Sequence, residues 1–417
     1  MNAETRKTLE DMVDSFQGWV KEILVVAEGV ADRPAAASLE DRIRREGQRL
    51  LGQVLTAAMQ LAVDAQPEAR TCPHCGGARR HKGRRRRTPL SSLGAVRLEG
   101  VYWYCPRCGQ GEHAADAVVG RSFSEVLREL LCLLAVGLVS FERASQAATK
   151  VLGVRVDDET LRRLTHREGE RVKAAPLSAP LVPPQTDLVA SCDGTMVHIR
   201  EDGWRELKAY LFTHEAGRLG GAHLEEAEQF TPRLRQAALA LRAGQARRVF
   251  AVSDAAEWID RGFRIQWPMA IRIVDLWHAC QHVQAAGQFL YPKDEAQGRR
   301  WGRSWSTRLR QQGGAKVLAA LSHRRGKPAA WHQALAPLRR YLANQADRLD
   351  YPTYEALGYP ISSGSMESRC KQLGRRLKGP GMRWSRPNVD PMAALVSVWA
   401  DNRWDRYWHP TVPTPQT

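Results

Sequence analysis

Three acidic residues lie where secondary structure would hold their carboxylates in place. Asp193 and Asp254 each follow an apolar run that is typical of a buried strand. Glu367 falls in the first turn of a helix that Ser363 or Ser365 can cap. Cleavage of a phosphodiester by two divalent cations needs a few carboxylates from separated chain positions, which hold the cations about 3.5–4 Å apart. The three acids are therefore a candidate site for a pair of Mg²⁺ or Mn²⁺ ions.

Asp275 ends a third strand-like run, after those of Asp193 and Asp254, and several of these acids also have a purely structural interpretation. Asp254 precedes Ala-Ala-Glu-Trp and Asp275 precedes Leu-Trp-His-Ala, so either carboxylate could cap a helix. Glu367 could simply be stabilised by the positive end of its helix. Capping alone is a poor explanation for three strand-end acids in one predicted domain, so a role in chemistry is favoured.

Basic residues surround the glutamate. Lys371 and Arg375 follow Glu367 at spacings that place all three on one face of a helix. Arg383 comes shortly afterwards, and together these cations would offset the charge of a bound phosphodiester. The alternative is a solvated basic helix face.

Four of the eight cysteines form two pairs with metal-ligand spacing. Cys72 and Cys75 frame Pro-His and precede Gly, and Cys105 and Cys108 frame Pro-Arg and precede Gly. The chain begins without an apolar signal segment, so a disulfide framework is the weaker interpretation. Four thiolates that fill a tetrahedral shell predict a structural zinc site. Alternating residues at 95–104 predict a strand that runs into the second pair.

A basic run, Arg84, Arg85, Arg86 and Arg87, lies between the cysteine pairs. It can be a solvated loop, but next to a zinc ribbon contact with nucleic-acid phosphates is better supported.

Composition narrows the class of protein. The 417 residues hold 62 Lys+Arg against 45 Asp+Glu, a formal net charge of +17, with 43% hydrophobic residues. This is globular composition, long enough for two or three domains. The positive excess points to a polyanionic partner, most simply nucleic acid, although a soluble basic enzyme is an equally good interpretation of the charge alone. No apolar run is long enough to span a membrane, and a cytoplasmic protein is expected.

Periodicity outlines the rest of the chain. Helical patterns fill 4–65, broken at Pro34–Ser38, and a plain helical hairpin is favoured there over a DNA-contacting arm. Helices at 145–152 and 158–170 could be a helix-turn-helix or a simple packing motif. Strands at 188–199, 204–213, 248–254 and 270–275, with a helix at 232–243, predict a mixed α/β sheet. A stripe formed by Trp301, Trp305 and Leu309 is more typical of core than of a base-stacking platform.

Several motifs together resemble those of DDE transposases of bacterial insertion sequences, in particular the Kra-type group of the Mutator-like superfamily. They are the paired cysteine knuckles, Cys-Asp-Gly-Thr at 192–195, Ser-Asp-Ala-Ala-Glu-Trp-Ile at 253–259, Asp-Leu-Trp-His-Ala-Cys-Gln-His at 275–282 and the long run at 362–384. These motifs stand in the family's order and cover most of the chain from Cys72 to Trp384.

The resemblance implies an RNase H-like fold interrupted by a helical insertion, with the catalytic DDE triad on Asp193, Asp254 and Glu367. It also places His278 near the active site, where the side chain would help to position DNA or a leaving group. The family often has Gly after the second aspartate, whereas this chain has Ala255.

The expected fold is therefore multidomain. Its predicted parts are an N-terminal helical region at 1–68, a zinc ribbon at 69–112, a helical HTH-like region and linker at 113–182, the first part of the RNase H-like domain at 183–282, a helical insertion at 283–358, the last part of that domain at 359–405 and a tail at 406–417.

The expected function is transposition. The protein would bind the ends of its insertion sequence, cleave them with Mg (or Mn) and join them to target DNA, as a homo-oligomer on DNA associated with the nucleoid. Two alternatives remain: a non-catalytic zinc-ribbon DNA-binding protein, such as a domesticated copy, and a Mg-dependent nuclease of the same fold.

Overall fold

The computed structural model describes residues 3–68, 70–177, 179–323 and 328–410. The chain is a mixed α/β protein that divides into two compact units, Met1–Thr165 and His166–Thr417. The prediction of a multidomain α/β protein is confirmed at this level. None of the described helices combines the length and the apolar character that a membrane crossing requires.

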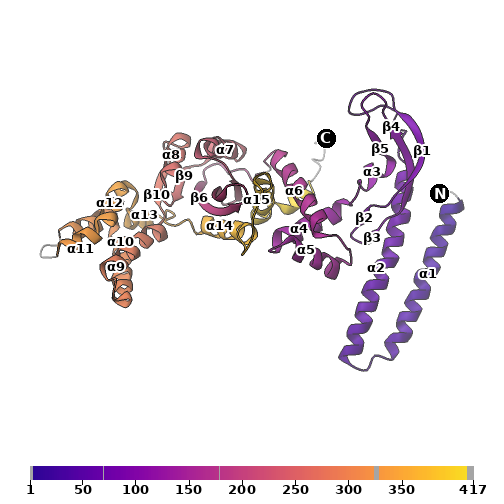
Figure 1. Ribbon diagram of the computed structural model, residues 1–417, viewed down its shortest axis with the longest axis horizontal. Coiled ribbons are helices and arrows are strands. Elements are labelled where there is room, and N and C mark those ends of the chain that lie inside the picture. Colours follow the sequence, from indigo (N-terminus) through magenta and orange to yellow (C-terminus); the bar gives the residue numbers. More distant parts are fainter. Residues whose placement is uncertain (1–2, 69, 178, 324–327, 411–417) are drawn as a thin grey trace. The chain divides into compact units, whose positions relative to one another are not determined.

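Two long helices, α1 (Ala3–Glu28) and α2 (Arg33–Asp64), open the first unit as a hairpin (Figure 1). The break between them lies before Pro34, not at Pro34–Ser38 as predicted. Asp32 caps α2 by accepting a hydrogen bond from the Ala35 amide at 2.8 Å, and Pro34 occupies the first turn. A proline is tolerated there because its missing N–H would have no partner within the helix.

A small sheet follows, in the strand order β1-β4-β5. Its strands are β1 (Arg80–Arg87), β4 (Leu98–Tyr104) and β5 (Gly111–His113), accompanied by the hairpin of β2 (Leu90–Ser91) and β3 (Gly94–Ala95) and by the short helix α3 (Ala114–Val118). The strand predicted to enter the second cysteine pair is β4. The arginine run lies on β1, an edge strand, and not in a loop.

Helices return after residue 124. They are α4 (Glu125–Gly137), α5 (Phe141–Ala147), a π-helical turn (Ala148–Leu152) and α6 (Asp158–Ala174), which crosses the division between the units. Leu127, Leu131, Ala144 and Leu161 form the centre of their core. Val126 of α4 is 51% exposed and lies outside this core.

The second unit is built on a five-stranded sheet in the order β10-β9-β6-β7-β8. Its strands are β6 (Asp187–Ile199), β7 (Gly203–His214), β8 (Gly217–His223), β9 (Arg248–Ser253) and β10 (Ile271–Val274). β6, β7 and β8 form an antiparallel meander, whereas β9 runs parallel to β6 and β10 parallel to β9. β8 was not predicted.

Alternation along β6 separates the two faces of this sheet. Leu188, Ala190 and Cys192 pack against α7 (Ala227–Ala240) and α8 (Glu257–Gln266) in one core cluster. The intervening residues of β6 therefore point to the opposite face. Asp193 is one of these intervening residues, so its side chain points to the sheet face opposite α7 and α8.

Helices complete the second unit. They are α9 (Leu276–Leu290), α10 (Glu295–Ser322), α11 (Ala329–Ala334), α12 (Ala336–Asn344), α13 (Tyr351–Ala356), α14 (Gly364–Leu377), α15 (Arg386–Ala400) and α16 (Trp404–Trp408), with 3-10 turns at Ala243–Gln245 and Ala346–Arg348. Helices α9 to α13 gather beyond the β10 edge of the sheet (Figure 1). Trp305 and Leu309 are buried in their core, and Trp301 packs against it, as predicted.

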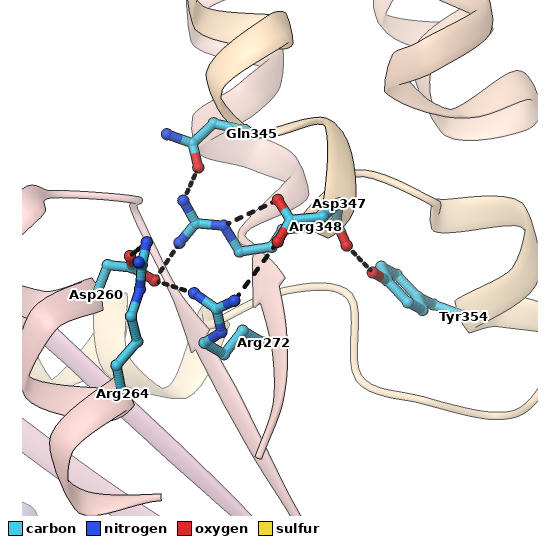
Figure 2. Close-up of polar contacts among 7 residues, drawn as sticks. All are labelled: Asp260, Arg264, Arg272, Gln345, Asp347, Arg348 and Tyr354. Atoms are coloured by element: carbon cyan, nitrogen blue, oxygen red, sulfur yellow. Dashed lines mark hydrogen bonds and ion pairs between the residues drawn. The ribbon is translucent and has the colours of Figure 1, made fainter. Parts of the chain in front are cut away.

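One buried carboxylate ties the sheet to these helices (Figure 2). Asp260 on α8 is 8% exposed and binds Arg264, Arg272 of β10, at 2.8 Å, and Arg348 from the 3-10 turn. Burial raises the pKa of Asp260, but the guanidinium groups of Arg264 and Arg272 outweigh burial and leave the pKa below its usual range.

Replacing Asp260 should therefore be costly. Asp260→Asn leaves the buried Arg348 with only its longer contact to the exposed Asp347, at 3.8 Å, and should lower the free energy of unfolding by about 3 kcal/mol. Arg264 is 62% exposed, so Arg264→Gln should cost less than about 1 kcal/mol. Urea denaturation of both variants measures the difference, and equal losses would contradict the network.

The lowered pKa of Asp260 also predicts how stability depends on pH. The stabilisation is present above the unfolded-state pKa of Asp and is lost as the pH falls through the folded-state pKa.

Candidate active site and metal centre

The parallel pairing of β6 and β9 brings two of the predicted acids together. The last pair of this ladder is Ala190 with Ala251, and three residues further along the chain stand Asp193, still on β6, and Asp254, directly after the end of β9. Residues in register on neighbouring strands point to the same side, and the strands lie about 4.8 Å apart. Both carboxylates therefore belong to the sheet face opposite α7 and α8.

Asp193 is held by short-range partners. Its Oδ1 accepts a hydrogen bond from the Gly194 amide at 2.7 Å, and the Cys370 thiol of α14 contacts the carboxylate. Burial raises the pKa of Asp193, and the charge of Asp254 raises it further. Two carboxylates that disfavour each other's charge are a place where a cation would be stabilised.

Asp275 is the next acid in the same row, because β10 pairs with β9 up to Val274. It is 6% exposed, and its oxygens accept from the His278 amide at 2.8 Å and from the amide and hydroxyl of Ser363. The capping interpretation is confirmed for Asp275, which joins α9 to the start of α14. Asp254 has no such role: its Oδ1 accepts from the Ala256 amide at 3.1 Å, and α8 begins without a side-chain cap.

His278 belongs to a cluster of rings beside this pair of acids. Its Nε2 lies 3.2 Å from Nε2 of His282, whose ring stacks on Tyr341 with centroids 3.9 Å apart. The charge of His278 acts on Asp193, and that of Asp254 acts on His282 and Tyr341. The Tyr341 hydroxyl is buried without a hydrogen-bond partner among the described residues.

Sequence reasoning missed three neighbours of the acids: Cys370, His282 and Tyr341. Helical spacing offered a signal for two of them, because Cys370 follows Glu367 by three residues and His282 follows His278 by four. Nothing in the local sequence marked Tyr341, which comes from the distant helix α12.

Glu367 stands apart from the two aspartates. It lies in the first turn of α14, as predicted, but its side chain is 62% exposed and forms an ion pair with Lys371 at 2.8 Å. Arg375 and Arg383 are also exposed. Within the described part of the chain, the acids do not form a close-set ligand group of three. The structure thus brings Asp193 and Asp254 together and leaves the carboxylate of Glu367 facing solvent.

The four paired cysteines do form a close-set group. Their Sγ atoms all lie within 4.8 Å of one another, with Cys72 and Cys108 3.6 Å apart and Cys75 and Cys105 3.5 Å apart. Four sulfur ligands in this arrangement could bind zinc.

The same turn is built at both cysteine pairs. The Gly76 amide donates to the Cys72 carbonyl and the Gly109 amide donates to the Cys105 carbonyl, each at 2.9 Å. Both glycines have positive φ, 67° and 71°, which a residue with a side chain rarely adopts. The Gly that ends each motif is therefore required by the turn that directs both sulfurs inward.

The arginine run on β1 has partners within the protein. Arg84 pairs with Asp64 at 2.9 Å, Arg86 with Glu99 at 3.0 Å and Arg87 with Asp116 at 3.8 Å, while Arg85 lies over the Tyr102 ring. Arg84, Arg85 and Arg86 remain exposed. Phosphate contact by these side chains stays a prediction.

The group of four cysteines predicts how much zinc the protein and its cysteine variants bind. Cys105→Ser removes one sulfur and should reduce bound zinc well below one ion per chain, because a tetrahedral structural site needs all four ligands. Cys370→Ser, which changes a cysteine outside the group, should retain zinc. Elemental analysis by mass spectrometry measures both, and full zinc content in Cys105→Ser would contradict the site.

The backbone conformation of Ala255 predicts that its replacement by glycine stabilises the protein. Its φ is 58°, in the left-handed region, where a Cβ costs about 1–2 kcal/mol. Ala255→Gly relieves this strain and, after the extra chain entropy of glycine, should raise the free energy of unfolding by up to about 1 kcal/mol. The neighbouring Ala256 has φ of −60°, so Ala256→Gly should be destabilising instead. Thermal denaturation tests the opposite signs, and a loss of stability in both variants would refute the strain.

Comparison with protein-family models gives no match for this chain. Comparison with curated protein sequences gives none either. Among solved structures, the chain is similar to one from the Drosophila P element transposase strand transfer complex, with 8% sequence identity and a TM-score of 0.26 over 70% of this chain and 81% of that chain. No family membership follows from a similarity of this size.

Proposed function

We propose that this protein is a DDE transposase that binds DNA ends and catalyses Mg-dependent strand cleavage and strand transfer. The observation that carries the proposal is the parallel pairing of β6 with β9, which brings Asp193 on β6 near Asp254 directly after β9, where the charge of Asp254 acts on Asp193. The mixed sheet, with an antiparallel meander followed by two parallel strands, is compatible with an RNase H-like core interrupted by the helical segment α10–α13.

The donor set fits a hard divalent cation. Asp193 and Asp254 offer carboxylate oxygens, the ligands that Mg²⁺ and Mn²⁺ prefer. Burial and the charge of Asp254 raise the pKa of Asp193, so a bound cation would stabilise its charged form. When bound, such ions would activate the attacking oxygen and stabilise the leaving one. Glu367 would be the third ligand, in exchange for its ion pair with Lys371.

Other residues would position the substrate. The Gly194 amide and the Cys370 thiol hold the Asp193 carboxylate in place, and His282 contacts the Nε2 atom of His278, whose charge acts on Asp193. Lys371, Arg375 and Arg383 are exposed cations near Glu367 in sequence and would offset the charge of bound phosphates.

The cysteine group would hold a zinc ribbon that presents Arg84 to Arg87 to DNA. We propose transposon ends and target DNA as partners, action as a homo-oligomer on DNA, and a cytoplasmic, nucleoid-associated location. The net charge of +17 supports a polyanionic partner.

One observation favours a second candidate. Because the Glu367 carboxylate faces solvent and pairs with Lys371, a non-catalytic zinc-ribbon DNA-binding protein would need no change in the arrangement seen here. A Mg-dependent nuclease would share the acids but not join DNA.

Removal of each acid separates these candidates. Asp193→Asn, Asp254→Asn and Glu367→Gln should each reduce Mg-dependent cleavage of DNA that borders the gene to background, while DNA affinity stays within about twofold, because the ligands do not contribute the bulk of phosphate binding. Glu201→Gln, which changes an exposed acid on the turn after β6, is the matched control and should cleave normally. Unchanged cleavage in Glu367→Gln would remove that residue from the site.

Joining of the cleaved end separates the transposase from the nuclease. The wild-type protein should link the freed 3′ end to a second DNA duplex in the presence of Mg²⁺, measured as a covalent product on a denaturing gel. Cleavage without any joined product would favour the nuclease, and neither product from wild-type protein would favour the non-catalytic candidate.

A further inference from the structure

A second polar surface, unrelated to the acids or the cysteines, lies within the first unit. It is an open groove of about 1180 Å³ bordered by α1, α2, the turn between β2 and β3, and the turn after the π-helical segment. Its polar lining includes Arg44, Arg45, Arg49, Gln53, Thr56 and Arg97.

The groove is strongly basic. Four arginines line it, against one acid, Asp11. Arg45, Arg49 and Gln53 follow one another at intervals of four on α2, so they form a single stripe along the helix. Arg49 and Arg97 are exposed, while Arg44 and Arg45 share the exposed Asp41 at 2.9 Å and 2.8 Å.

The floor of the groove is fixed. Gln48 of α2 donates to the Ser92 carbonyl at 3.2 Å and to the Leu152 carbonyl, so it joins the helix to both turns. Gly52 allows this close approach, because a Cβ there would lie 2.9 Å from the Leu93 carbonyl oxygen. The basic stripe is thus presented on a rigid surface and not on a free arm.

The side chains that line the groove are of the types that contact the sugar-phosphate backbone of a nucleic-acid duplex. Guanidinium, amide and hydroxyl groups are the side chains that contact phosphate and sugar oxygens. Proteins that hold single strands add aromatic side chains on which bases stack. Among the described residues of this groove there is no Phe, Trp or Tyr.

We infer that this groove binds the phosphodiester backbone of double-stranded DNA. The inference deepens the proposed function, on which it rests, by assigning DNA affinity to α2 and Arg97 separately from the arginine run of β1. Phosphates displace Asp41 from Arg44 and Arg45. Arg49, whose charge also acts on Glu46, and Arg97 contact the DNA backbone from exposed positions.

The salt dependence of binding tests the inference. The full-length double variant Arg49→Gln/Arg97→Gln removes two phosphate contacts, so the slope of log K against log salt should fall by about 2 for a fluorescent 20-base-pair duplex of arbitrary sequence. Affinity near 150 mM salt should drop by roughly tenfold or more. Fluorescence anisotropy measures both quantities, and circular dichroism checks that the helices are intact.

A matched control removes the same charge elsewhere on the hairpin. Lys21→Gln/Arg33→Gln changes two basic residues of α1 and α2 outside the groove and should keep a slope within about 0.5 of wild type. An equal fall in both double variants would show only a general charge effect and would overturn the inference. Stronger binding of single-stranded DNA or of duplex RNA than of duplex DNA would overturn it too.

The outcome is distinguishable from failure of the proposed function. Normal duplex binding by the groove variant, with cleavage lost in Asp193→Asn, refutes the groove and leaves the transposase proposal standing. Lost binding in the groove variant, with cleavage retained in Asp193→Asn, supports the groove and refutes the catalytic assignment.

Discussion

The candidate site depends on the parallel register between β6 and β9. Because side chains alternate along a strand, a slip of one residue in β9 would turn Asp254 toward α7 and α8, into an apolar core. The register is held by the buried residues that precede the acids, with Ala190 beside Ala251 in that core. The position of two charges is thus set by the packing of uncharged side chains.

Burial of Asp193 has a cost that the neighbouring backbone offsets. The Gly194 amide donates to this carboxylate, and a Cβ at Gly194 would lie 2.1 Å from an oxygen of Glu206. A larger residue at 194 would have to displace the Glu206 side chain and disturb its ion pair with Lys208. Glycine at 194 thus supplies the backbone donor for Asp193 and leaves room for Glu206.

Sequence patterns predicted the elements better than the contacts between them. The apolar runs before Asp193 and Asp254 marked β6 and β9, and the cysteine spacing marked a group of sulfurs that the fold does assemble. β8 escaped prediction because its glycines replace the usual β-forming side chains. The fold shows why they are there: a Cβ at Gly221 would meet the ring of Tyr210. Such a requirement lies in another strand and leaves no mark in the local pattern.

For Glu367, the sequence predicted the helix position but not the direction of the carboxylate. Helical spacing correctly placed it on one face with Lys371, yet that spacing also supplies the ion pair that draws its carboxylate toward solvent. An exposed pair of this kind is worth little, about 0.3–0.5 kcal/mol, so it is a weak constraint on the side chain. The backbone of α14 is held more firmly, through Ser363 and Asp275, and Cys370 of the same helix already contacts Asp193. The described contacts therefore hold the backbone of this helix more firmly than the exposed Glu367 side chain, whose described partner is Lys371.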